Sequence, residues 1–76
     1  MKLYAGGYLT FYMPGQDSQI ECDISDPVEL ITLLDELDIP AGEVQLVILN
    51  GQIVDLDGAI LENQDEVKVY PGVDGG

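Results

Sequence analysis

Residues 26–37 read DPVELITLLDEL, which predicts one amphipathic helix around which the rest of the fold is organised. Asp26 can cap the first turn, Pro27 suits the first helical position, and Glu29 can reach back as in a capping box. The apolar stripe at helical spacing consists of Leu30, Leu33, Leu34 and Leu37. Ile39-Pro40 ends the helix, because a residue before proline avoids the helical region.

The segment before this helix contains three strand-like runs. Lys2–Ala5 and Tyr8–Met13 both alternate, and Gly6-Gly7 between them allows either one long strand with a glycine bulge or two short strands. The sequence PGQD at residues 14–17 is a strong turn signal, after which Gln19–Ile24 alternates again. These runs predict a hairpin ahead of the helix.

Three more strands are expected after the helix. Val44–Leu49 is apolar except for one glutamine, which is typical of an interior strand covered at least partly on both faces. Asn50-Gly51 predicts a tight hairpin turn, from which Gln52–Leu56 returns. Turn signals then lead to the final strand, Glu66–Tyr70.

These elements predict an α+β fold, with one mixed sheet and the helix packed across one face. The strand residues expected to meet the leucine stripe are Leu3, Ala5, Ile20, Cys22, Leu46, Ile48, Val67 and Val69. If the first and last strands are parallel neighbours at the centre, both lysines, Lys2 and Lys68, point to the open face. The partner-binding surface that we expect on that face consists of Tyr4, Val47, Leu49 and Tyr70.

Length and charge limit the possible partners. A chain of 76 residues is one small domain, and 46% hydrophobic residues are too many for a disordered chain. Fifteen acidic residues against two lysines give a net charge of -13, which disfavours nucleic acid and anionic membranes. The acidity indicates either a basic protein partner or a means of keeping the protein in solution.

The residue types argue against intrinsic catalysis. The chain has no histidine, so neither a Ser/His/Asp nor a Cys/His set can form, and we expect no enzyme activity of its own. Cys22 is the only cysteine and alternates with apolar neighbours, which indicates a buried, inert thiol and a reducing, cytoplasmic location. The acidic residues near Asp57 do not match a calcium loop, so no metal site is expected.

Four stretches together resemble the ThiS/MoaD family of ubiquitin-like sulfur carriers, which share the β-grasp fold. They are KLYA at residues 2–5, YMPG at 12–15, LNGQ at 49–52 and DEVKVYPGVDGG at 65–76. Together with the leucine-rich helix they cover essentially the whole chain. The Pro-x-Val-x-Gly-Gly ending is nearer to the MoaD branch, the small subunit of molybdopterin synthase, than to ThiS.

The resemblance implies a β-grasp domain over residues 1–70 and a flexible Gly-Gly tail over residues 71–76. In that family a partner similar to ubiquitin-activating enzymes uses ATP and magnesium to adenylate the terminal carboxylate, here that of Gly76. A sulfur-donor protein then supplies the sulfur of a thiocarboxylate, which an acceptor such as a synthase large subunit receives. The carrier binds no cofactor itself. The tail residues implied to enter the partner are Pro71, Val73, Asp74 and Gly75.

Two other functions fit the same residues. In a ubiquitin-like modifier, a lysine amine would attack the activated Gly76 and form an isopeptide. In a β-grasp interaction module, the Gly-Gly ending would be incidental, since glycine is common at frayed chain ends. Loss of Gly76 separates the last function from the other two.

Overall fold

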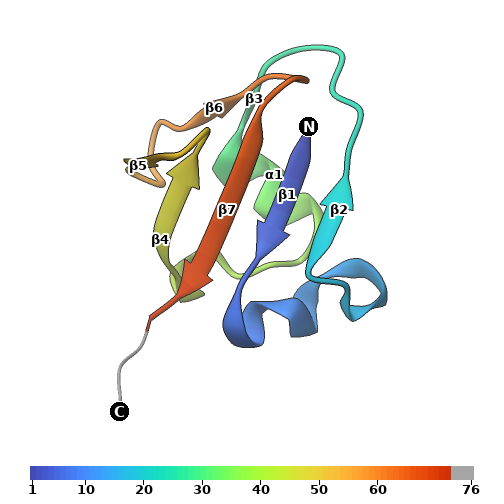
Figure 1. The fold of residues 1–76 in the computed structure, drawn as a ribbon, viewed down its shortest axis with the longest axis vertical. Helices are drawn as coiled ribbons and strands as arrows, with labels where there is room; N and C mark the ends of the chain where they lie inside the picture. Colours follow the sequence, from blue (N-terminus) through green and yellow to red (C-terminus); the bar gives the residue numbers. More distant parts are fainter. Residues whose placement is uncertain (73–76) are drawn as a thin grey trace.

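The computed structural model describes residues 1–72, and its main feature is a five-stranded sheet with the strand order β2-β1-β7-β4-β5. The strands are β1 (Lys2–Ala5), β2 (Gln19–Glu21), β4 (Val44–Leu49), β5 (Gln52–Val54) and β7 (Glu66–Pro71). β1 and β7 are parallel and the other neighbours are antiparallel, so the sheet is mixed. Helix α1 (Leu30–Glu36) crosses one face, as Figure 1 shows. The predicted α+β class is confirmed, and the arrangement is β-grasp-like.

The core lies between α1 and the sheet and contains only aliphatic side chains and methionine. Leu30 and Leu34 of the helix are fully buried, as are Leu3 of β1 and Val67 and Val69 of β7. The leucine stripe predicted from the sequence therefore does face the sheet. Burying each of these side chains contributes about 1.5–3 kcal/mol, so this layer is the main source of stability.

The helix begins later than the sequence predicted. Val28–Glu29 form a short strand, β3, which pairs antiparallel with β6 (Ile60–Leu61). The backbone N–H of Leu30 donates to the carbonyl of Ala59 at 2.9 Å, and Glu29 occupies the N-cap position without a side-chain capping bond. The predicted cap by Asp26 and capping box by Glu29 are therefore wrong. Pairing with β6 holds Val28 and Glu29 in an extended conformation, and this overrides the local preference of the segment to start a helix.

The run Tyr8–Met13 was also predicted wrongly, because it belongs to a 3-10 helix rather than a strand. This helix, η1 (Gly7–Tyr12), is followed by η2 (Pro14–Gln16), while a third, η3 (Ala41–Glu43), precedes β4. Leu9 and Met13 are the buried residues of the run, whereas Phe11 midway between them is 72% exposed, so the burial does not follow the alternation of a strand. β2 consequently pairs with β1, and η1 and η2 form the long connection between them.

The Asn50-Gly51 turn is present as predicted, and it also fastens β4 to the start of β7. Asn50 and Gly51 have φ values of 50° and 85°, the left-handed pair that a tight hairpin turn requires. The Asn50 Oδ1 accepts a hydrogen bond from the backbone N–H of Glu66 at 2.9 Å, and its Nδ2 donates to Asp65 Oδ1 at 2.9 Å. Asp65 Oδ2 in turn accepts from the N–H of Glu62 at 2.7 Å.

We expect the Asn50 side chain to stabilise the fold separately from its backbone conformation. Asn50→Gly keeps the positive φ but loses both side-chain hydrogen bonds, so the free energy of unfolding should fall by about 1 kcal/mol. Asn50→Ala loses the bonds and also strains the turn, which should cost about 1 kcal/mol more. Urea denaturation followed by circular dichroism measures both. Equal stability of the two variants and the wild type would show that this network contributes nothing.

Candidate functional site

The candidate site is the edge of the sheet where the central strand β7 ends. β1 runs parallel to β7 beside it, so the residues that follow both strands, Gly6-Gly7 and Gly72, come to the same edge (Figure 1). The N–H of Gly6 donates to the carbonyl of Val69 at 2.9 Å, which extends the pairing of β1 with β7 by one residue. The end of β7 is therefore held by the segment that follows β1.

Three glycines allow the chain to close tightly around this edge. A Cβ on Gly6 would overlap the Tyr70 ring, and one on Gly7 would lie 2.9 Å from Cγ of Pro71. A Cβ on Gly72 would lie 2.7 Å from Cγ of Gln45. Gly7 also has a φ of 55°, which side-chain-bearing residues rarely adopt. The Tyr70 and Pro71 rings therefore occupy the space that side chains at positions 6 and 7 would fill. We call the Gly6-Gly7 pair the seat of these two rings.

An open, mostly apolar groove of about 500 Å³ lies beside this seat. Its lining residues are Gly7, Gln45, Leu46, Tyr70, Pro71 and Gly72. The groove therefore lies beside Tyr70, Pro71 and Gly72, at the end of β7.

The open face of the sheet carries the residues that the parallel pairing predicted. The Tyr4 and Tyr70 rings lie 6.0 Å apart between centroids and are tilted by 56°, a favourable geometry for an aromatic pair. Tyr4 is in register with Lys68, and Lys2 lies two residues earlier on β1, so both lysines are on this face. Tyr4 and Tyr70 are each half-buried.

Two of the four predicted docking residues are not on this face. Val47 pairs with Val69 and is only 3% exposed, and Leu49 pairs with Val67 and packs against the core. Leu46, which pairs with Tyr70, and Ile48, which pairs with Lys68, lie on the open face instead. Those two were expected in the core.

The error has a physical cause in β4 itself. Its apolar residues occupy both faces, so the alternation that normally sets the register is missing. The strand is also irregular between Val44 and Leu46, where the pairing with β7 shifts. The surface we now define as the open face consists of Tyr4, Tyr70, Leu46, Ile48 and Ile53, together with the two lysines.

Gly76, the predicted adenylation site, lies outside the described residues, as do the predicted tail residues Val73, Asp74 and Gly75. Pro71, which was expected to begin the tail, is the last residue of β7 and pairs with Val44. The ordered strand therefore extends one residue beyond the predicted boundary of the domain.

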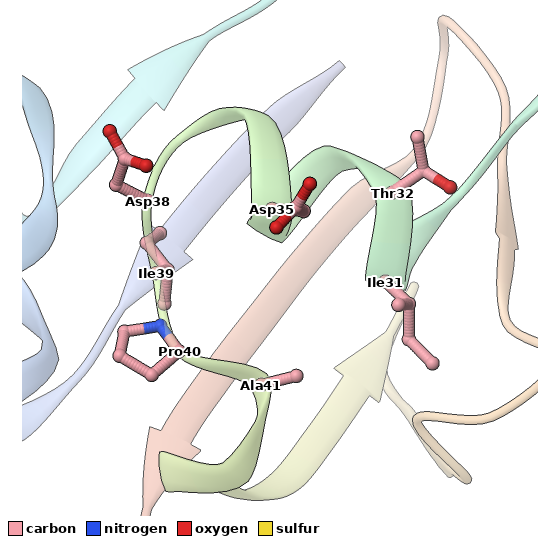
Figure 2. Close-up of a pocket in the computed structure, with 7 residues that line it drawn as sticks. All are labelled: Ile31, Thr32, Asp35, Asp38, Ile39, Pro40 and Ala41. Atoms are coloured by element: carbon pink, nitrogen blue, oxygen red, sulfur yellow. The ribbon is translucent and has the colours of Figure 1, made fainter.

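A second hollow lies on the helix side of the molecule, between α1 and the loop that follows it (Figure 2). Its polar lining is limited to the carboxylates of Asp35 and Asp38 and the hydroxyl of Thr32, with apolar groups around them. Within residues 1–72, no three His, Cys, Asp or Glu side chains gather where they could hold a metal ion. In the same part of the chain no helix is long and apolar enough to cross a membrane.

Sequence comparison adds no family assignment to this geometry. No protein-family model matches the chain, and no curated protein matches it in sequence. A functional assignment therefore depends on the fold, the edge where β7 ends and the pattern of the last residues.

The seat can be tested by adding one methyl group to it. Gly6→Ala should lower the free energy of unfolding by about 1–3 kcal/mol, because the new Cβ overlaps the Tyr70 ring. The matched control is Gly42→Ala, since a Cβ on Gly42 meets nothing within 4 Å. In the double variant with Tyr70→Ala, the cost of Gly6→Ala should largely disappear. Strictly additive costs in urea denaturation would mean that the ring does not rest on Gly6.

Proposed function

We propose that this protein is a cytoplasmic sulfur carrier whose Gly76 carboxylate is converted to a thiocarboxylate. The observation that carries the proposal is the course of β7. It is the central strand of a β-grasp-like sheet, its end rests on the Gly6-Gly7 seat, and the residues after Gly72 are Val73-Asp74-Gly75-Gly76. A strand held in the sheet, followed in the sequence by two glycines without side chains, suits delivery of a terminal carboxylate into a partner's active site.

The reaction follows from the weak reactivity of a carboxylate. Its charge is delocalised, so the carboxylate oxygen of Gly76 first attacks the α-phosphate of ATP, and pyrophosphate leaves. The resulting acyl-adenylate carries a good leaving group. Hydrosulfide equivalents from a sulfur-donor protein attack its carbonyl carbon, a C–S bond forms, and AMP departs with the former carboxylate oxygen. The thiocarboxylate then donates its sulfur to an acceptor in the biosynthesis of a molybdopterin-type or thiamin-type cofactor.

The division of labour between carrier and partners agrees with the residues of this chain. The chain has no histidine, the commonest general base, and we assign that role to the partner. The activating partner, similar to ubiquitin-activating enzymes, supplies ATP, magnesium and the catalytic groups. The carrier supplies the docking surface, the strand β7 that leads to the last residues, and the carboxylate of Gly76. The large subunit of a synthase binds the acceptor molecule that receives the sulfur.

Bare glycine at Gly75 and Gly76 is what such delivery requires. Without Cβ atoms the backbone fits a narrow channel and can adopt conformations closed to other residues. Reaction at an activated phosphate tolerates little misplacement, and an error of ~1 Å can cost on the order of 100-fold in rate. The last residues therefore need to lack side chains, and their number has to place the terminal carboxylate at the phosphate.

The decisive experiment incubates the chain with its cognate activating enzyme, ATP, magnesium and sulfide. Intact-mass spectrometry should show the exchange of one terminal oxygen for sulfur. Deletion of Gly76 should abolish the exchange, because the new terminus falls one residue short of the phosphate. Cys22→Ser should be charged as well as the wild type, since the sulfur is held on the terminal carbonyl. Charging of the Gly76 deletion to the wild-type level would refute the carrier function.

The same experiment separates the competing functions. Conjugates of higher mass, linked through isopeptide bonds to lysines, would identify a ubiquitin-like modifier instead. A chain that the activating enzyme leaves unmodified, with or without Gly76, would identify an interaction module whose last residues play no part.

The open face is the surface that we propose to dock the activating enzyme. Tyr4→Ala should weaken binding of the enzyme by about 1–2 kcal/mol, because aromatic side chains dominate binding energy at interfaces. Tyr4 is preferable to Tyr70, which also holds the Gly6 seat. The control is Ile60→Ala in β6, a 54% exposed residue outside the five-stranded sheet. Isothermal titration calorimetry with folded variants measures the effect, and equal affinities for both would remove this face from the interface.

A further inference from the structure

All five aromatic side chains of this protein are partly or largely exposed, and none belongs to the core. They are Tyr4, Tyr8, Phe11, Tyr12 and Tyr70. Aromatic residues bury 150–250 Å² each and usually dominate core energetics, so a small domain that leaves all of them outside is unusual. Tyr4 and Tyr70 belong to the open face already described, but the other three do not.

The remaining three lie in one six-residue segment, η1. Phe11 is 72% exposed, Tyr8 45% and Tyr12 38%. Single exposed apolar residues need no explanation, but three rings within five positions form a cluster. Tyrosine and phenylalanine are also the residue types that anchor interfaces, because they bring a large area with few rotatable bonds.

The segment is held as a defined scaffold and is not a loose loop. Leu9 and Met13, which flank Thr10, Phe11 and Tyr12 in the sequence, are buried in the core. The N–H of Leu9 donates to the carbonyl of Gly6 at 3.2 Å, and the N–H of Met13 donates to that of Thr10 at 3.1 Å. The Thr10 hydroxyl donates to the carbonyl of Gly7 at 3.2 Å. Two buried anchors and short-range hydrogen bonds thus present Phe11 outward in a fixed geometry.

The scaffold also begins at the edge where β7 ends. Gly7 is its first residue and lines the groove together with Gly72, and the Pro71 ring leaves no room for a Cβ on Gly7. Figure 1 shows η1 at the same end of the sheet as the C-terminal end of β7. A partner that takes up the residues after Gly72 therefore meets η1 at the same end of the molecule.

Charge determines what kind of partner can cover these rings. A second copy of the chain would bring a net charge of -13 against another -13, which opposes self-association. The charge also disfavours nucleic acid and anionic lipid. The complementary occupant is a protein surface with apolar recesses surrounded by lysine and arginine.

We propose that η1 is a second docking element, separate from the open face, whose Phe11 inserts into an apolar recess on a basic surface of the activating enzyme. The inference rests on the proposed function, because that function names the enzyme that receives the chain's ending. Contacts at η1 form before and during the chemical step alike. Their loss therefore affects binding of the carrier and leaves the rate at saturation unchanged.

The test compares Phe11→Ser with Ile60→Ser in the full chain, with the cognate activating enzyme as the probe. Ile60 has similar polarity and is exposed, but it lies in β6, at the opposite end of the molecule (Figure 1). Phe11→Ser should raise the Kd and the KM for the carrier by about tenfold or more, with kcat within twofold of the wild type. Ile60→Ser should change none of these, and Phe11→Leu should restore most of the affinity. Raising the salt concentration should weaken the wild type and Phe11→Ser by the same factor.

Each outcome decides between distinct conclusions. If Phe11→Ser and Ile60→Ser bind equally, or if binding is independent of salt, this inference is overturned while charging of Gly76 still supports the carrier function. If the wild type binds the enzyme and Phe11→Ser does not, but Gly76 is never charged, the docking element stands and the carrier function fails. If the wild type does not bind the enzyme at all, both are wrong.

Discussion

The parallel pairing of β1 with β7 is the constraint on which the rest of the structure depends. It places Leu3 beside Val67 and Ala5 beside Val69, four buried residues that form the floor under α1. Because the first and last strands are joined, the pairing closes nearly the whole chain into one unit. That closure has a large entropic cost, and burial of the leucine stripe of α1 against this floor offsets it. The same pairing brings the residues after both strands to one edge.

Most of the framework could be predicted from the sequence because it follows from patterns that neighbouring residues carry. The leucine stripe, the alternation of β1 and β7 and the Asn50-Gly51 turn each have one dominant local interpretation. The errors arose where a distant partner decided the outcome. Val28–Glu29 have good helix-start chemistry but pair with β6, and Tyr8–Met13 contains β-prone aromatic residues but folds on two anchors spaced four apart. β4 is apolar on both faces, so only its pairing with β7 reveals which residues face outward.

The site was predictable to a similar extent. Tyr4 and Tyr70 were found because each alternates with core residues beside a lysine, which marks the outward face. From the sequence, Gly6-Gly7 indicated only a bulge in one strand or a break between two, because the groups that require these glycines, the Tyr70 and Pro71 rings, lie far away in the sequence. A glycine pair directly after a strand does signal close approach of another group. The sequence signal does not reveal which group approaches. The glycine pair belongs to the site because the approaching groups are Tyr70 and Pro71, at the end of β7.

The aliphatic residues form the core and the aromatic residues lie on the surface, and this distribution indicates a functional role for the end of the sheet where β7 ends. A domain of this size buries only about 60% of its unfolded surface, so each large apolar side chain left outside is a substantial loss of stability. This protein builds its core from leucine, valine, isoleucine, alanine and methionine and keeps every aromatic ring for the open face and η1. It also places two glycines, which disfavour folding, where the rings of Tyr70 and Pro71 need room. Both departures from maximal stability concern the surroundings of the end of β7. Selection for stability alone would not concentrate them there, whereas selection for presenting the end of β7 to a partner would.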